Sequence, residues 1–215
     1  DDFELATYQA IKDRYSSNII LHAFQFVVNT YSIENHLIES FFSSMRSDLS
    51  KKKHSSETYD EYVYGSAEVV GLMCLRVFTK NDQTLYESLV KPAKKLGSAF
   101  QKVNFFRDIK EDFFEKGRTY FPGFEIEKNL NDVQKSNIED EISNEFEEAL
   151  KGIYKLPLTS RFGVLLACRY YKKLFKQLKS TPVEKLFSKR IRVNNFIKAM
   201  LVPSTFILTI FKRSY

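Results

Sequence analysis

The chain has 215 residues, of which 43% are hydrophobic, and its 33 basic and 27 acidic residues give a formal net charge of +6. This composition supports a real hydrophobic core and excludes a low-complexity chain, so we treat residues 1–215 as a single domain. The charge is uneven: residues 1–148 hold 18 Lys/Arg against 26 Asp/Glu, whereas residues 149–215 hold 15 Lys/Arg against one acid. A basic segment of this kind attracts phosphates or anionic lipid. Nucleic acid is the weaker interpretation, because no nucleic-acid-binding signature accompanies the charge.

Apolar residues recur at helical spacing along most of the chain, and strand-like alternation is hard to find. We therefore predict an all-α protein. In chain order, the expected helices lie at 3–14, 18–32, 34–50, 58–79, 84–117, 133–150 and 160–179. Charged or Pro/Gly-containing loops are expected at 51–56 and 118–132, and the tail is basic and then apolar.

Small and special residues refine this prediction. Gly65 and Gly71 lie in the expected helix 58–79, where they permit close packing against a neighbour. Pro92 is predicted to break the following helix, and Gly117 is a plausible C-terminal cap. The two cysteines, Cys74 and Cys168, lie far apart in apolar contexts, which favours buried free thiols in a reducing compartment.

A polar stripe crosses the apolar segment between residues 96 and 122. At about 100° per residue, six residues fall within an arc of roughly 100°. These residues are Gly97, Gln101, Asn104, Asp108, Glu111 and Asp112. The bland interpretation is a solvated acidic face on an amphipathic helix. Against it, the stripe itself carries no lysine or arginine, and Gly97 suggests that something approaches closely.

The spacing of the carboxylates suggests a second interpretation. Asp108 and Asp112 are four residues apart and point the same way, so their charges repel each other. A divalent cation removes that repulsion, and Mg²⁺ prefers carboxylates completed by substrate phosphates. Spacing alone leaves the metal site and the solvated face equally open.

Two longer motifs add specificity. The segment "YDEYVYGSAEVVGLMCLRVF" (59–78) matches Y-x-x-Y-x-x-x-x-A-x-x-V-G-x-M, and "LGSAFQKVNFFRDIKEDFFEKGRTYFP" (96–122) matches L-G-x-A-x-Q-x-x-N-x-x-R-D-x-x-x-D followed by R-x-Y-x-P. With these motifs the whole chain resembles the phytoene/squalene synthases, which condense prenyl diphosphates head to head. Details such as "GRTYFPG" are more similar to bacterial phytoene synthases than to eukaryotic squalene synthases.

The resemblance implies an isoprenoid synthase fold, a helical bundle around a central cavity with Mg²⁺ (alternatively Mn²⁺) at its mouth. It implies that Asn104, Asp108 and Asp112 are metal ligands. The residues implied to act on the substrate or line its diphosphate end are Tyr62, Gln101, Arg107, Arg118, Tyr120, Tyr171 and Arg190. Of these, Tyr171 and Arg190 rest on the shorter matches.

The implied activity is the condensation of two geranylgeranyl diphosphates to 15-cis-phytoene through prephytoene diphosphate, in carotenoid biosynthesis. Squalene or dehydrosqualene synthesis from farnesyl diphosphate uses the same motifs and remains an alternative. A non-catalytic homologue that acts as an assembly or binding factor is a second alternative, although such a protein has no need for the polar stripe.

Two further expectations concern the ends of the chain. The family's first aspartate-rich motif lies before the region that corresponds to residue 1, so we expect the bundle to be incomplete at its N-terminus. The tail "FIKAMLVPSTFILTIFKRSY" (196–215) is interrupted by Lys198 and Pro203 and is too short to span a bilayer. We expect either packing on the bundle or peripheral membrane contact by a cytoplasmic protein.

Overall fold

The computed structural model describes residues 2–50, 55–115, 117–121, 132–188 and 190–211. Every regular element within these residues is helical, which confirms the all-α prediction. In chain order, the elements are α1 (Asp2–Asp13), α2 (Ile19–Tyr31), α3 (Asn35–Ser50), α4 (Ser56–Val63), the π-helical turn η1 (Tyr64–Glu68), α5 (Val69–Thr79), α6 (Gln83–Phe114), α7 (Asp132–Ile153), α8 (Leu158–Lys179), α9 (Val183–Leu186) and α10 (Asn195–Phe211).

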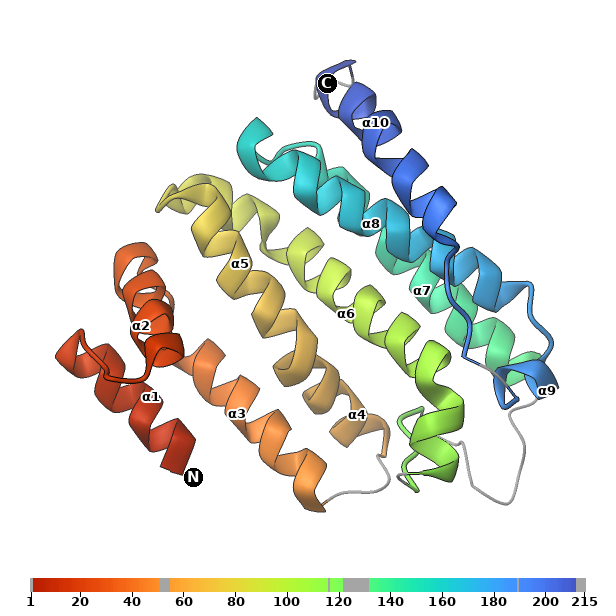
Figure 1. Cartoon of the computed structure of the whole chain (residues 1–215), viewed down its shortest axis with the longest axis horizontal. Helices are drawn as coiled ribbons and strands as arrows, with labels where there is room; N and C mark the ends of the chain where they lie inside the picture. The colour runs from red at the N-terminus through yellow and green to blue at the C-terminus, as the bar shows by residue number, and fades with distance from the viewer. Residues whose placement is uncertain (1, 51–54, 116, 122–131, 189, 212–215) are drawn as a thin grey trace.

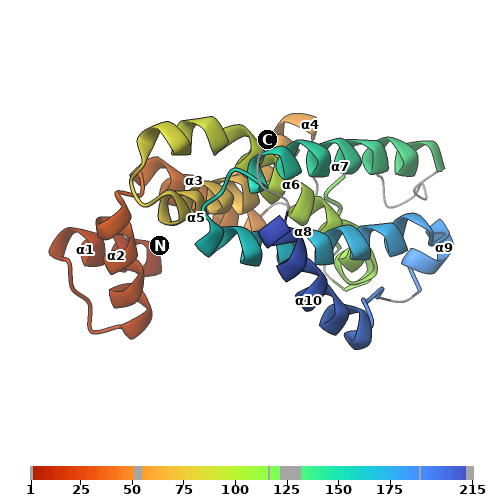
Figure 2. The same ribbon diagram turned by 90° about the horizontal axis from the view of Figure 1, so that it is seen from above.

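The long helices are arranged around α6. Figure 1 shows α3, α5, α6, α8 and α10 side by side, with α6 in the middle. Helix α7 packs against both α6 and α8, and α1 and α2 form a pair at the far end of the molecule (Figure 2). Helix α6 therefore contacts both neighbours in the row as well as α7, which places its faces in different environments.

Two main groups of buried side chains hold the bundle together. The larger group joins α6, α7 and α8 and includes the fully buried Phe106, Phe146 and Leu165. The smaller group joins α2, α3 and α5 around Val28 and Leu37. At roughly 25 cal/mol per Å² of apolar surface, burial of side chains of this size is the main favourable contribution to folding.

The starts of several helices follow from local capping. Asn18 accepts hydrogen bonds from the backbone of residues 20 and 21, and Ser55 and Asp82 cap α4 and α6 in the same way. These contacts satisfy N–H groups that have no partner inside the helix. The turn expected near residues 31–34 is confirmed, since α2 ends at Tyr31 and the next residue, Ser32, adopts φ 52°.

Two helix predictions need correction. The expected helix 58–79 is interrupted by η1, where one wider turn separates α4 from α5. The break predicted at Pro92 is wrong, because α6 runs through this proline as one helix of 32 residues. Proline removes one backbone hydrogen bond, but the ring of Pro92 is held against Gly152 of α7, and such packing can outweigh the local preference.

The small residues act as notches between helices. A Cβ atom added to Gly65 would lie 2.4 Å from the carbonyl oxygen of Ser40, which belongs to α3. One added to Gly71 would lie 2.9 Å from that of Ala93. The close packing predicted for these positions is confirmed. Gly117 has φ 61°, a left-handed conformation that suits the predicted C-terminal cap. Residues 51–54 and 122–131 of the two expected loops lie outside the described part of the chain.

Candidate active site

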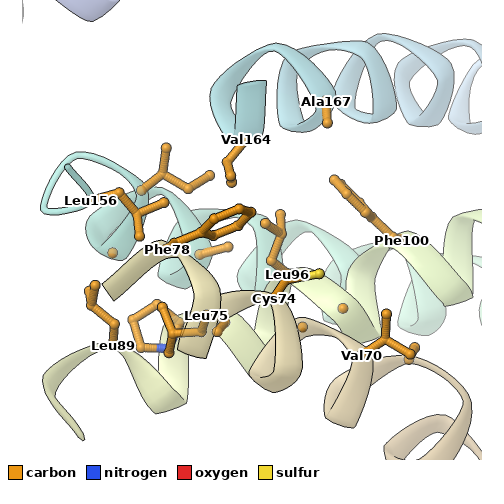
Figure 3. Close-up of a pocket in the computed structure, with 18 of the residues that line it drawn as sticks. Val70, Cys74, Leu75, Phe78, Leu89, Leu96, Phe100, Leu156, Val164 and Ala167 are labelled. Atoms are coloured by element: carbon orange, nitrogen blue, oxygen red, sulfur yellow. The ribbon is translucent and has the colours of Figure 1, made fainter. Parts of the chain in front are cut away.

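An apolar groove of about 640 Å³ lies along α6, between α5 and α8. In Figure 3, α5 and α8 form its two walls, and Phe100 and Leu96 project into it from α6. Its volume is in the range usual for small-molecule sites. Most of its lining is aliphatic or aromatic, with Ser66, Thr159 and Ser160 as polar exceptions along its walls, so the groove is suited to a long hydrocarbon chain rather than to a polar ligand.

Polar groups gather at one end of this groove. Gln101 and Asn104 project from α6, and Tyr171 projects from α8. The hydroxyl of Tyr171 donates a hydrogen bond to Oδ1 of Asn104 at 3.2 Å, and its ring stacks on Phe100 with centroids 4.0 Å apart. The amide oxygen of Asn104 is thereby oriented at the boundary between the apolar groove and the charged residues that follow it on α6.

One turn beyond Asn104, Asp108 is held between two arginines. Arg107 donates to Asp108 from Nε at 3.0 Å and from Nη2 at 2.5 Å, and Nε of Arg190 lies 2.8 Å from Oδ1 of the same carboxylate. The hydrogen bonds to Asp108 raise the pKa of Arg107, while its partial burial acts in the opposite direction. The stripe therefore has basic partners after all, and both are only partly buried.

Asp112 lies one further turn along and is buried, with 8% of the residue exposed. Its backbone oxygen accepts a hydrogen bond from the backbone of Arg118 at 2.8 Å. The guanidinium of Arg118 reaches across to α3, where it donates to the backbone oxygen of Asp48 at 2.5 Å. The turn after α6 thus brings the backbone of Arg118 back to the polar stripe at Asp112.

Aromatic rings from three segments pack together next to Asp48, in the buried core and outside the lining of the groove. Tyr62 of α4, Phe105 of α6 and Tyr120 form a stack, with the Phe105 and Tyr120 centroids 4.2 Å apart. The hydroxyl of Tyr62 donates to Oδ2 of Asp48 at 3.0 Å. Burial, followed by the nearby Tyr120 and Asp48, raises the pKa of Tyr62, so this phenol stays protonated.

Sequence reasoning missed Asp48. It meets both Tyr62 and Arg118, and its Oδ1 atom is buried without a hydrogen-bond partner among the described residues, with Arg118 at 3.8 Å. Asp48 shows no helical spacing with the other acids, so only its position between two motifs in space marks it. The close approach predicted at Gly97 is confirmed. The neighbour is the backbone oxygen of Ala67 in η1, 2.6 Å from an added Cβ.

The residues of the stripe offer suitable ligands for a metal ion, but these ligands do not form a complete coordination site. Asn104, Asp108 and Asp112 offer oxygen atoms, which hard cations prefer. However, the described residues contain no group of three or more His, Cys, Asp or Glu side chains that could hold an ion, and Asp108 is paired with arginines. These residues therefore fit one side of a magnesium site, which diphosphate oxygens and further ligands would have to complete.

A family model described as squalene/phytoene synthase matches residues 2–196. The chain belongs to this family. It is 32% identical over 197 residues to a chloroplastic phytoene synthase of an Oncidium hybrid cultivar, covering 82% of this chain and 46% of that protein. It is 28% identical over 206 residues to the chloroplastic phytoene synthase of Daucus carota, covering 87% of this chain and 51% of the relative. The chain thus spans about half the length of these curated relatives.

The fold is that of the isoprenoid synthases. A dehydrosqualene synthase solved in complex with a ligand superposes with a TM-score of 0.75 and 20% identity, covering 96% of this chain and 76% of that chain. A squalene synthase from Alicyclobacillus acidocaldarius gives a TM-score of 0.71 and 18% identity, covering 83% of this chain and 72% of that chain. At these identities the likeness establishes the architecture alone, and the chemistry has to be argued from the family and the site.

Proposed function

We propose that the protein containing this chain condenses two prenyl diphosphates head to head, with geranylgeranyl diphosphate as substrate and 15-cis-phytoene as product. The observation that carries this proposal is the continuity of the apolar groove with the polar stripe of α6, from Phe100 through Asn104 to Asp108. A prenyl diphosphate matches this arrangement, because it is a long hydrocarbon chain that ends in a charged diphosphate group. Phytoene synthases among the curated relatives support the choice of product.

The residues of this chain divide the work of ionisation. Arg107, Arg190 and Arg118 supply fixed positive charge for the diphosphate, through hydrogen bonds that are strengthened by charge. Asn104, Asp108 and Asp112 are the groups that would hold Mg²⁺, with Mn²⁺ as an alternative. Such an ion neutralises charge on the departing diphosphate.

The aromatic groups face the other product of ionisation, the allylic cation. Phe100 and the ring of Tyr171 stack at the start of the apolar groove, where the first carbons of the chain would lie. Their π faces attract positive charge and offer no nucleophile, and the apolar walls beyond them exclude water. Because Tyr62 is held protonated, its hydroxyl remains a hydrogen-bond donor, currently engaged by Asp48.

Product analysis of the full-length protein tests this proposal. Incubation with geranylgeranyl diphosphate and Mg²⁺ should yield phytoene, with less or no product after chelation and partial recovery with Mn²⁺. Formation of dehydrosqualene from farnesyl diphosphate, or of squalene when a hydride donor such as NADPH is also supplied, would support the alternative substrate. Absence of any condensed hydrocarbon with both substrates would overturn the enzymatic proposal and favour a non-catalytic role.

We also propose peripheral membrane contact through α10, with the protein otherwise in the cytoplasm. This helix runs through Pro203 as one element. Arg169 of α8 donates to the hydroxyls of Ser204 and Thr205, and Thr205 and Thr209 are buried. Most of the large apolar side chains of α10 are instead exposed: Phe196, Met200, Val202, Phe206, Ile207, Leu208, Ile210 and Phe211.

This arrangement supports contact with one leaflet rather than passage through the bilayer. Among the described residues, no helix is both long and apolar enough to cross a membrane. The exposed rings could enter the interface, where apolar burial and basic residues both favour binding to anionic lipid. Co-sedimentation with vesicles should weaken when Phe206 and Phe211 are both changed to Ser. Binding that is unaffected by this change and by lipid charge would contradict the proposal.

A further inference from the structure

The groove has a direction that three helices define together. Its polar end contains Asn104 of α6 and Tyr171 of α8, whereas Leu89 of α6 and Phe78 of α5 line the opposite end. Leu89 and Asn104 are fifteen residues apart in α6, or about 22 Å at 1.5 Å per residue. If the diphosphate lies at the polar end, the tail of the prenyl chain points towards Phe78.

The distal end is closed by a packed cluster. Leu75, Tyr86, Leu89 and Leu156 are buried there, and Phe78 packs against them. The guanidinium of Arg161 donates to the backbone oxygen of Leu156 at 2.8 and 3.0 Å, which ties the turn before α8 to that helix. The end of the groove is therefore formed by packed helical side chains and a turn that is hydrogen-bonded to α8.

Phe78 stands at this boundary. Its ring points across the groove towards Val164, with Leu156 behind it (Figure 3). The ring is only partly buried, so it borders open space on the side of the groove. Leu156 already lines the groove, so removal of the Phe78 ring would widen and deepen this end of it.

Gly163 of α8 also lines the groove and has free space in front of it. A Cβ atom added there would meet nothing within 4 Å, whereas one added to Gly152 would lie 2.3 Å from the ring of Pro92. Gly163 is thus a position where a side chain would fill the groove without displacing its neighbours. Its helical backbone would also gain from the change, because glycine is a poor helix former.

We propose that Phe78 and the space in front of Gly163 set the length of the prenyl chain that the groove accepts. This inference rests on the proposed function, since it names the part of the same site that selects among prenyl diphosphates. Phe78 blocks the end of the prenyl chain, and Gly163, which has no side chain, leaves room for the last isoprene unit.

Two substitutions with opposite expected effects test this inference in the full-length protein. Phe78→Ala should raise relative kcat/KM for a C25 prenyl diphosphate over the C20 substrate, and Gly163→Leu should favour the C15 substrate over C20. Each ratio should change roughly tenfold or more, because one extra methylene in an apolar pocket is already worth about tenfold. Gly163→Ala should shift the ratio in the same direction as Gly163→Leu, but less.

Phe162→Ala is the matched control, because Phe162 lies on α8 but packs against Phe206 of α10 and does not line the groove. It should leave the chain-length ratios unchanged. Circular dichroism should show that each variant is folded. Wild-type activity with unchanged ratios in folded Phe78→Ala and Gly163→Leu would overturn the inference alone. Absence of condensed product from the wild type with C15, C20 and C25 substrates would overturn the proposed function itself.

Discussion

Helix α6 carries two ionic clusters on different sides, and their surroundings differ. On the side facing α7, Nζ of Lys102 lies 2.8 Å from Oε1 of Glu145, and only 5% and 4% of these side chains are exposed. Ser98 donates to the same carboxylate oxygen at 2.9 Å. Beyond the polar end of the groove, Asp108 meets Arg107 and Arg190, with exposed fractions from 18% to 43%.

The comparison shows how similar charges can serve different ends. The Lys102–Glu145 pair is sealed between two helices, and the second partner of each residue is more exposed: Glu141 for Lys102 and Lys95 for Glu145. Loss of either residue of the pair would therefore leave a buried charge with only a partly exposed partner. The Asp108 cluster follows the groove on α6 and keeps contact with solvent, so its arginines can exchange the carboxylate for a diphosphate at modest cost. Burial and proximity to the groove, rather than charge itself, separate the structural cluster from the candidate catalytic one.

The largest expected effect comes from the buried cluster. Glu145→Ala should destabilise the chain by up to about 3–5 kcal/mol, because the buried Lys102 would keep only Glu141, whose side chain is 50% exposed, as its acidic partner. Urea unfolding followed by circular dichroism measures this change. Glu147→Ala, at an exposed position of the same helix, should stay within about 0.5 kcal/mol of the wild type. Equal unfolding midpoints for both variants would contradict the proposal that the Lys102–Glu145 cluster stabilises the fold.

The second expected effect falls on activity instead of stability. Asp108→Asn in the full-length protein should reduce kcat by about 10²–10³, the usual loss for one preorganised charged or polar group in an active site. The unfolding midpoint should change little, since the side chain is partly exposed. Asp140→Asn, on the exposed surface of α7, is the control. If Asp108→Asn and Asp140→Asn have equal turnover, Asp108 is not part of the reaction.

A smaller effect is expected at Arg190, which pairs with Asp108 from outside α6. Arg190→Gln should raise KM for the prenyl diphosphate by about tenfold, in line with loss of one hydrogen bond to a charged group, about 1.5–3 kcal/mol. The difference from wild type should shrink at high salt, because this side chain is 43% exposed. Arg192→Gln, two residues along and also exposed, provides the comparison. A KM that rises equally in both variants would indicate a general charge effect.

The smallest expected effect concerns the orientation of Asn104. Tyr171→Phe removes the hydroxyl that donates to Asn104 while it keeps the ring on Phe100. Loss of this hydrogen bond should cost about 1 kcal/mol, or roughly fivefold in kcat/KM. Tyr170→Phe is the neighbouring control. Unchanged kinetics in Tyr171→Phe would show that Asn104 keeps its orientation without the phenol.

Local periodicity predicted the parts of this site that lie on one helix. Gln101, Asn104 and Asp108 follow one another along α6 as the arc of the stripe requires. The pairing of Lys102 with Glu145 could not be predicted from spacing, because the two residues are 43 positions apart in the chain. The pairing of Asp108 with Arg190 likewise depends on how the bundle closes and not on spacing within α6. Contacts between residues so far apart in the sequence can be identified only from the three-dimensional structure.

The π-helical turn η1 has a consequence for the phase of the two helices that it joins. Its hydrogen bonds span one residue more than those of an α-helix, so the turn shifts the helical register by one position, about 100° of rotation. Because of this rotation, residues that would lie on one face of an unbroken α-helix lie on different faces of α4 and α5. Tyr62 before the turn faces Phe105, while Val70 after it faces the groove. The extra residue in this turn thereby allows α4 to face the core at Phe105 while α5, which continues it, faces the groove.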